Sequence, residues 1–285
     1  MPELILKPRT LKELWRLPPS PGGSRKYLAG GTDLVNGANA GLDAFKVWVD
    51  ISDIKELQGI KETKTSLIIG AGVKISELGN SRLISQWLPV LHAAIPHFAS
   101  PSLRNMATIG GNAATASPCA DGACALCAER AVVWLELRGK KRKIALSSLF
   151  KGPKKTSLRK DELITAFEVP KWHHSGAYLK LGPRAYFGIS KVSVALALEL
   201  DEGKVKAVSI ALASVAPVPL MAFKTANYLT GRILNKENAR TAAALVKTEV
   251  FPITDARSEA AYRREMSGVL LERALNLIAN NEDAS

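Results

Sequence analysis

Apolar positions in the first part of the chain follow two alternating patterns, one with the spacing of short strands and one with the spacing of short helices. Residues 75–98 carry apolar side chains at helical spacing, and Pro89 and Pro96 divide this stretch into short helices. A further helix is expected at 10–16. Compact apolar runs that predict strands occur at 26–29, 47–51, 66–70, 132–137, 143–146 and 163–169. This order predicts a mixed region of helices and strands that ends near residue 170.

A different pattern follows a short stretch at 171–176, which we expect to link two domains. Two β-rich runs, 192–200 and 204–213, are joined by Asp201-Glu202-Gly203, and this predicts a hairpin because glycine suits the turn. Helical spacing of apolar residues then dominates at 223–229, 237–248 and 258–278. The second region is therefore expected to combine a hairpin with helices.

Two pairs of glycines stand among small hydroxyl and amide side chains, one within Ala29–Leu34 and the other within Thr108–Pro118. Consecutive glycines can turn successive backbone N–H groups toward one concavity, called a nest, which suits phosphate oxygens. They also remove the Cβ atoms that would hold a diphosphate away from the backbone. Either pair alone could be a plain tight turn. Two such pairs, each after an apolar segment, favour a site that holds a dinucleotide diphosphate.

The two common nucleotide-binding motifs are absent from the sequence. Residues 67–77 begin like a nicotinamide-binding fingerprint, with a strand that runs into Gly70-Ala71-Gly72, but Ile75 stands in place of the third glycine. A phosphate-binding P-loop, a serine nucleophile motif and a zinc-binding H-E-x-x-H are also missing. The sequence therefore indicates a protein with no catalytic residue of its own, which holds a cofactor whose chemistry performs the reaction.

Composition and charge narrow the class of protein further. The chain has 285 residues, of which 47% are hydrophobic and 23% charged, and this excludes a disordered or fibrous protein. Lysine and arginine number 39 against 26 acidic residues, so the net charge is +13. Ten of these basic residues lie in Arg138–Lys160, which has no acidic residue, and the rest of the chain has a net charge of only +3.

For this basic segment, Arg138–Lys160, we expect a solvated hairpin face or, less favoured, a docking surface for an acidic partner. Binding of nucleic acid is not expected, because Phe150 is the one aromatic residue of the segment that could stack on a base.

Three cysteines, Cys119, Cys124 and Cys127, lie close together with the spacing C-x4-C-x2-C. This spacing matches the first three ligands of a plant-type [2Fe-2S] site, but the chain has no fourth cysteine. The alternative is that Cys124 and Cys127 are small buried residues on one face of a helix. We favour this alternative and assign no metal site.

Neither a targeting segment nor a membrane span is expected. Met1–Lys7 lacks the apolar core of a secretory signal. The longest uncharged, mainly apolar run, Ala207–Phe223, contains Pro217 and Pro219 and is shorter than the about 20 residues that cross a bilayer. The expected location is the cytoplasm.

The two glycine-rich segments carry a family resemblance. Ala29–Leu34 (AGGTDL) and Thr108–Asp121 (TIGGNAATASPCAD) resemble the two flavin-binding signatures of the FAD-binding medium subunit of molybdenum hydroxylases. This family includes xanthine dehydrogenase, aerobic CO dehydrogenase and 4-hydroxybenzoyl-CoA reductase. Further segments that match the family, in the same order along the chain, are 50–60, 69–72, 162–170, 190–192 and 262–275.

The resemblance implies an α+β fold in two parts. Residues 1–172 would form an FAD-binding domain of the vanillyl-alcohol-oxidase (PCMH) type, with subdomains at about 1–58 and 59–172. Residues 177–285 would form a C-terminal CO-dehydrogenase-flavoprotein-like domain, built of a small antiparallel sheet and helices.

The resemblance also implies which residues bind FAD. In this family both glycine loops cradle the FAD diphosphate through backbone amides. Asp121 would bond the sugar-alcohol chain of the flavin or an adjacent group, and Ile164 would line the cofactor pocket. Lys180 would lie near the flavin and Ile189 beside its isoalloxazine ring. The implied FAD-binding positions are Leu28, Ala29, Gly30, Gly31, Thr32, Asp33, Thr108, Ile109, Gly110, Gly111, Asn112, Thr115, Asp121, Ile164, Lys180 and Ile189.

One segment differs from the family, and the basic segment stands apart from the family motifs. Tyr186-Phe187-Gly188 replaces an acidic run that some xanthine dehydrogenases carry at the face where the electron acceptor approaches, so the identity of the acceptor stays open. The basic segment is expected to lie outside both FAD-binding loops.

The activity implied is that of an oxidoreductase component: the FAD-carrying electron-transfer subunit of a molybdenum hydroxylase complex. A small [2Fe-2S] subunit would pass electrons to the flavin, and a large subunit would hold the molybdenum cofactor and oxidise the substrate. NAD or another soluble acceptor would then take the electrons. The alternatives are a stand-alone FAD-dependent oxidoreductase, an iron–sulfur protein that uses the cysteine cluster, and a basic nucleic-acid-binding protein.

Overall fold

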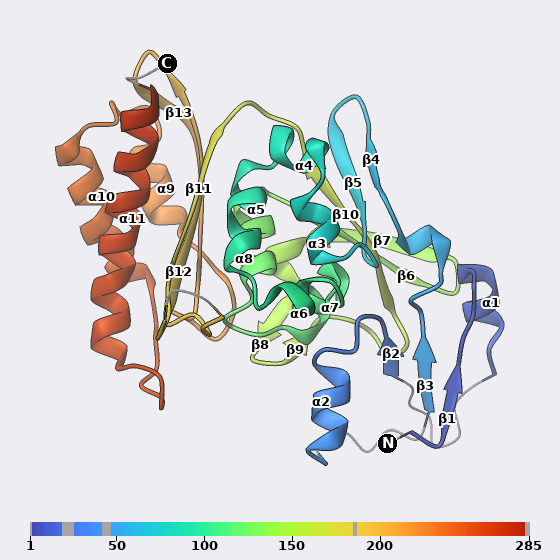
Figure 1. Ribbon diagram of the computed structural model, residues 1–285. Coiled ribbons are helices and arrows are strands. Elements are labelled where there is room, and N and C mark those ends of the chain that lie inside the picture. The colour runs from blue at the N-terminus through green and yellow to red at the C-terminus, as the bar shows by residue number, and fades with distance from the viewer. Residues whose placement is uncertain (1, 19–25, 42–46, 185–186, 283–285) are drawn as a thin grey trace.

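A small parallel sheet with two short helices forms the N-terminal part of the protein. The computed structural model describes residues 2–18, 26–41, 47–184 and 187–282. The elements of this part are β1 Leu4–Leu6, α1 Leu11–Arg16, β2 Lys26–Leu28, α2 Leu34–Asn39 and β3 Val47–Asp50. The strand order is β1-β3-β2 (Figure 1). Leu14 of α1 and Val49 of β3 are buried in one cluster together with Ile54 and Leu57. The glycine motif that follows β2 is therefore attached to a packed sheet.

A five-stranded antiparallel sheet lies next along the chain. Its strands are β4 Ile60–Glu62, β5 Ser66–Gly70, β6 Val132–Leu137, β7 Lys140–Ala145 and β10 Leu163–Pro170. Their spatial order is β4-β5-β10-β6-β7, and β10 is the central strand. A separate two-stranded hairpin is formed by β8 Phe150–Gly152 and β9 Lys155–Thr156. The strands predicted in this region from compact apolar runs are confirmed.

Short helices pack with this sheet, as the interrupted apolar spacing of 75–98 predicts. They are α3 Ile75–Gly79, α4 Arg82–Trp87, α5 Pro89–Ala94, α6 Pro101–Arg104, α7 Ile109–Thr115 and α8 Asp121–Ala128. Single 3-10 turns occur at Lys55–Leu57, Ile95–His97 and Leu146–Ser148. Pro89 begins α5, where a residue without an N–H group costs no helical hydrogen bond. Prolines therefore divide the helices at the predicted places.

The C-terminal part is a four-stranded antiparallel sheet with helices. Its elements are β11 Ser175–Leu181, β12 Val192–Asp201, β13 Lys204–Ala213, β14 Leu220–Met221, α9 Phe223–Leu229, α10 Lys236–Glu249 and α11 Ala260–Glu282. The hairpin predicted between β12 and β13 is confirmed. Glu202 and Gly203 at its turn both have positive φ angles, 48° and 75°, as a turn that matches the strand twist requires. The expected α+β class is confirmed.

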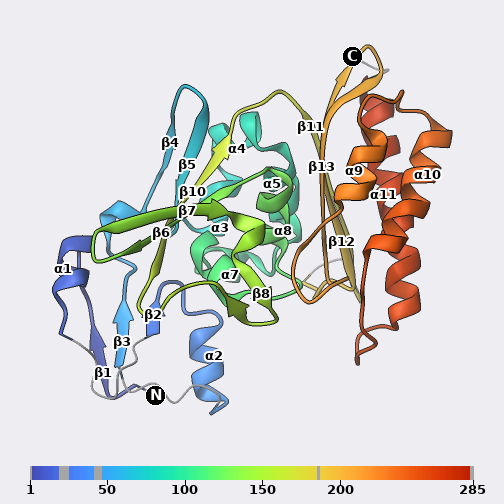
Figure 2. The same ribbon diagram turned by 180° about the vertical axis from the view of Figure 1, so that it is seen from behind.

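The C-terminal sheet lies between two helical layers (Figures 1 and 2). One face contacts α5 and α8 of the preceding region, and the other contacts α9 and α11. Alternate side chains of β12 point to opposite faces of the sheet. Ala195 and Ala197 are buried with α8, whereas Leu196 and Leu198 are buried with α11. Small alanines permit close packing across the boundary between the two parts. In the described residues, none of the helices is both long and apolar enough to cross a membrane.

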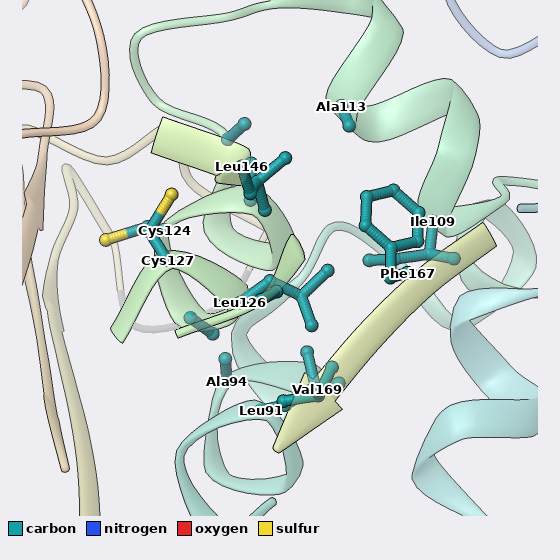
Figure 3. Packing of buried hydrophobic residues seen from close by; sticks show 14 of the residues in the cluster. Leu91, Ala94, Ile109, Ala113, Cys124, Leu126, Cys127, Leu146, Phe167 and Val169 are labelled. Carbon is teal, nitrogen blue, oxygen red and sulfur yellow. The ribbon is translucent and has the colours of Figure 1, made fainter. Parts of the chain in front are cut away.

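Cys124 and Cys127 are buried in the largest hydrophobic cluster, on α8 (Figure 3). Burial raises the pKa of both thiols, that of Cys127 to about 12. These are the properties of small core residues rather than of metal ligands. The favoured interpretation of this pair, two small buried residues on one helix, is confirmed. Among the residues that the structure describes, no three His, Cys, Asp or Glu side chains are grouped so that they could hold a metal ion.

Candidate functional site

The two glycine-rich motifs lie against each other although they are far apart in the chain. Thr115 donates its hydroxyl to Asp33 Oδ2 at 3.0 Å, which ties α7 to the loop before α2. The backbone at Gly30 also lies close to Met106, just before the second motif. A Cβ atom on Gly30 would be only 2.1 Å from the carbonyl oxygen of Met106. Glycine permits this approach of two backbones, and any side chain would prevent it. The two motifs therefore form the walls of one cleft.

Two adjoining cavities open along this cleft. Both are lined by Tyr27, Ala29, Gly30, Thr108, Gly111 and Ala114. The first, which we name the apolar cavity, has a volume of about 330 Å³ and is also lined by Ile51, Ala71, Met106, Leu158, Leu163 and Ile164. The second, the loop cavity, has a volume of about 470 Å³ and is also lined by Gly31, Thr32, Asp33, Leu34, Phe98, Asn112, Thr115 and Lys154. A mostly apolar chamber thus adjoins one lined by loop backbone and polar side chains.

The first glycine loop supplies free backbone donors. Gly31 has a φ of +72°, the conformation that glycine adopts without strain. Within the described chain, the four N–H groups from Gly30 to Asp33 have no protein acceptor, and these residues line the loop cavity. Successive free N–H groups beside a cavity are suited to phosphate oxygens. The residues of this loop fit the diphosphate of a dinucleotide.

The second glycine pair is not a nest, contrary to the sequence-based prediction. Gly110 and Gly111 lie in the first turn of α7, whose preceding residue, Thr108, accepts a hydrogen bond from Gly111 N at 3.0 Å. The N–H groups of Ile109 and Gly110 are bound by the carbonyl oxygens of Val73 and Ala71, at 3.0 and 2.8 Å, and Asn112 N is bound by Thr108 O. Helix capping and backbone pairing therefore occupy the donors that a nest would have offered.

The two glycines of α7 have different surroundings. A Cβ atom on Gly110 would lie 2.6 Å from the carbonyl oxygen of Ala71, so this glycine serves the packing of two backbone segments. A Cβ atom on Gly111 would meet Thr108 Oγ1 alone, at 3.0 Å, and Gly111 lines both cavities. Gly111 is therefore the glycine of α7 that leaves space for a ligand.

An ion pair forms part of the wall of the apolar cavity. Arg142 donates two hydrogen bonds to Glu162, of 2.7 Å from Nε and 2.6 Å from Nη2. These bonds hold the pKa of the buried Glu162 below its ordinary value. Ile164, two residues further along β10, lines the same cavity. The sequence patterns did not indicate Glu162 as a wall residue, because its contact depends on the pairing of distant strands.

Asp121 and Lys180 form a second ion pair, at the boundary between the two parts of the molecule. Lys180 Nζ lies 2.7 Å from Asp121 Oδ2, and the hydroxyl of Tyr178 donates to Asp121 Oδ1 at 2.6 Å. Burial raises the pKa of Asp121, and the positive charge of Lys180 opposes this shift. Neither residue of the ion pair lines the apolar or the loop cavity. Lys180 and His97 instead line a third one of about 310 Å³, the interdomain cavity.

Four of the implied positions line none of the three cavities: Leu28, Ile109, Asp121 and Ile189. Ile109 is fully buried in the core, and the side chain of Leu28 packs beside Gly31. Ile189 is 52% exposed. Tyr186, in the segment that differs from the family, is outside the residues that the structure describes. The remaining implied positions line the apolar or the loop cavity, apart from Lys180, which lines the interdomain cavity.

The basic segment lies outside both glycine loops in the sequence, as expected, but one of its lysines reaches the cavity beside them. Lys154, in the turn between β8 and β9, lines the loop cavity, and its Nζ lies 3.8 Å from Asp33 Oδ1. The N–H group of Lys154 also donates to Ala116 O just after α7. The hairpin fold carries this lysine to the cleft, which its position in the sequence did not reveal.

An apolar cavity, an adjoining loop with free amides and a flanking lysine fit a dinucleotide-binding α+β protein. Residues 3–172 match the FAD binding domain in molybdopterin dehydrogenase. Residues 177–278 match the CO dehydrogenase flavoprotein C-terminal domain. The chain therefore belongs to the family of FAD-binding flavoprotein subunits of molybdopterin dehydrogenases, and its class is that of oxidoreductases.

Relatives and solved structures agree with this family along nearly the whole chain. The carbon monoxide dehydrogenase medium chain of Afipia carboxidovorans is 33% identical over 94% of this chain and 94% of its own length. The putative xanthine dehydrogenase FAD-binding subunit XdhB of Escherichia coli K12 is 28% identical over 88% of this chain and 87% of its own. The structure of reconstituted CO dehydrogenase from Oligotropha carboxidovorans superposes with a TM-score of 0.93, at 30% identity, over 98% of this chain and 97% of that one. The two-part FAD-binding fold that the resemblance implied is confirmed.

Proposed function

We propose that this chain is the FAD-carrying electron-transfer subunit of a molybdenum hydroxylase complex. It would receive electrons from a [2Fe-2S] small subunit and pass them to NAD or another soluble acceptor, while a large subunit holds the molybdenum cofactor. The observation that carries the proposal is the cleft in which the free amides of Gly30–Asp33 face the wall formed by α7. The family of the chain and the medium-chain relatives support it.

The residues of the chain would bind and orient the cofactor. The amides of Gly30–Asp33 would bind the diphosphate, and the apolar cavity around Ile164 would take the planar adenine ring at the end of FAD opposite to the flavin. Gly111 would leave room for the cofactor beside α7. When bound, FAD supplies the redox chemistry through its isoalloxazine ring, and the protein supplies binding, orientation and electrostatics. In this account no side chain of the chain forms a covalent intermediate.

The other implied positions would line the cofactor or support the two glycine motifs. Thr108, Asn112 and Thr115 would line the path of the cofactor. Leu28 and Ile109 would support the two motifs from behind. Asp121, Lys180 and Ile189 would lie at the flavin end, close to the C-terminal part.

We also propose the domain division and location that the sequence indicates. The FAD-binding domain would comprise residues 1–172, with subdomains at about 1–58 and 59–172, and the C-terminal domain residues 177–285. The extents of the two family matches support this division. The protein would work in the cytoplasm as part of a complex, without binding nucleic acid.

The test is flavin reduction within the native assembly. The chain is purified from its source under mild conditions, its partners are identified, and the assembly is mixed anaerobically with a reductant that acts on the iron–sulfur subunit. We expect a co-purifying iron–sulfur subunit and a molybdenum subunit, and bleaching of the flavin absorbance that needs the iron–sulfur subunit. A chain that purifies alone and oxidises a substrate by itself would instead be a stand-alone flavin oxidoreductase.

A further inference from the structure

Four consecutive carbonyl oxygens, those of residues 96–99, are bound by two cations that approach from different parts of the molecule. Arg104 Nη1 donates to the carbonyl oxygens of Phe98 at 2.8 Å, Ala99 at 3.0 Å and, more weakly, Pro96 at 3.4 Å. Lys180 Nζ donates to the remaining one, His97 O, at 2.9 Å. We name residues 96–99 the carbonyl loop.

The conformation of the carbonyl loop explains why it needs such donors. A 3-10 turn ends at His97, so the carbonyl groups that follow have no helical partner. Ala99 has a φ of +36°, a conformation that costs energy for a residue with a Cβ atom. Charged donors form stronger hydrogen bonds than neutral ones. Arg104 thus stabilises a backbone shape that the loop would not hold alone.

The carbonyl loop stands between the cofactor cleft and the C-terminal part. Phe98 lines the loop cavity, whereas its neighbour His97 lines the interdomain cavity. Lys180 comes from β11 of the C-terminal part and is also paired with Asp121 at 2.7 Å. The position of Phe98 beside the cleft therefore depends on two cations, one on each side of the loop.

We propose that Arg104 is a positioning residue for the cofactor: it fixes the carbonyl loop so that Phe98 forms one wall of the cleft. Among the described residues Arg104 lines none of the three cavities, and its Nη1 is already bound to carbonyl groups, so it acts through the loop. This proposal rests on the proposed FAD function. It assigns to Arg104 a part in cofactor binding that none of the sequence motifs indicated.

The test compares FAD binding by the full chain and its Arg104→Gln and Arg104→Lys variants, each prepared free of cofactor. FAD affinity is measured by quenching of flavin fluorescence, and the visible absorbance and circular dichroism of bound FAD report its surroundings. We expect Arg104→Gln to weaken FAD binding about tenfold, the scale of losing hydrogen bonds from a charged donor, and to change the visible spectrum. Arg104→Lys keeps the charge but not the geometry of the donor. Its FAD affinity is expected to lie between that of Arg104→Gln and that of the wild type.

The control is Arg82→Gln, at an exposed position on α4, which should bind FAD as the wild type does. Thermal unfolding of the cofactor-free proteins separates a loss of cofactor positioning from a general loss of stability. Folded Arg104 variants with unchanged FAD affinity and spectrum would overturn the proposal. If Arg104→Gln does not fold, Arg104→Lys decides alone, and wild-type affinity in it would overturn the proposal. Failure of the wild type to bind FAD would instead overturn the proposed function.

Discussion

Thr115 and Asp33 are joined by a hydrogen bond of 3.0 Å between side chains that lie 82 positions apart in the chain. The bond connects the end of α7 to the residue that precedes α2. Both helices are short, and helices of this length derive little stability from their own hydrogen bonds. The geometry of the first glycine loop therefore depends on the second motif.

Replacing Thr115 with valine keeps the shape of the side chain and removes the donor. We expect Thr115→Val to weaken FAD binding by up to about fivefold, because a hydrogen bond of this kind contributes about 1 kcal/mol. The measurement is a fluorescence titration with FAD. Thr241→Val, which removes an exposed hydroxyl bonded within α10, is the matched control and should leave the affinity unchanged. Equal affinity in both variants would show that the bond between the motifs does not shape the loop.

Substitutions at two glycines separate packing from ligand space. Gly30→Ala places a Cβ atom against the carbonyl oxygen of Met106, so we expect the cofactor-free protein to lose about 1 to 3 kcal/mol of stability. Gly111→Val adds a side chain that faces the cleft, and we expect loss of FAD binding with a smaller effect on stability. Thermal unfolding and FAD titration of both variants check this contrast. Retained FAD affinity in Gly111→Val would contradict the placement of the cofactor beside α7.

Lys154 is the member of the basic segment that should affect the cofactor. Its charge lines the loop cavity, and its ion pair with Asp33 is exposed and therefore weak. We expect Lys154→Gln to lower FAD affinity modestly and to reduce its dependence on salt concentration, since salt screens exposed charges. Lys151→Gln, on the same hairpin, is the control and should change neither. The same salt dependence in both variants would exclude a role for Lys154.

Stability at acidic pH should depend on the Arg142–Glu162 pair. Arg142 lowers the pKa of Glu162 in the folded state below the ordinary value of 4.5. At a pH between the lowered pKa of the folded state and the ordinary pKa of the unfolded state, the unfolded chain binds more protons. The stabilisation from the pair is therefore fully present above pH 4.5 and is lost as the pH falls through the folded-state pKa. We expect Glu162→Gln to be less stable at pH 7 and to show a weaker fall in melting temperature below about pH 5. Glu202→Gln, at the exposed β12–β13 turn, should keep the wild-type pH profile.

Local patterns predicted most of the secondary structure because its determinants are close in the sequence. Pro89 marks the start of α5, and the turn between β12 and β13 has a glycine where a positive φ is needed. Burial of Cys124 and Cys127 followed from their small size and their spacing on a helix. In these cases one segment contains the whole physical reason for its structure.

The site was less predictable because its determinants are distant in the sequence. The glycine pair at 110–111 was predicted to form a nest, but carbonyl groups of Ala71 and Val73 take the amides of α7. The need for glycine at position 30 arises from Met106, and Lys154 reaches the cleft through a separate hairpin. Contacts of this kind depend on how distant strands pair, which local spacing does not encode.

The FAD content of the purified chain decides whether this protein is a flavoprotein. The protein is isolated, incubated with FAD and freed of unbound nucleotide, and the bound cofactor is released with acid and identified. We expect one FAD per chain and the visible spectrum of a flavoprotein. A folded, colourless chain that takes up no FAD would contradict this expectation.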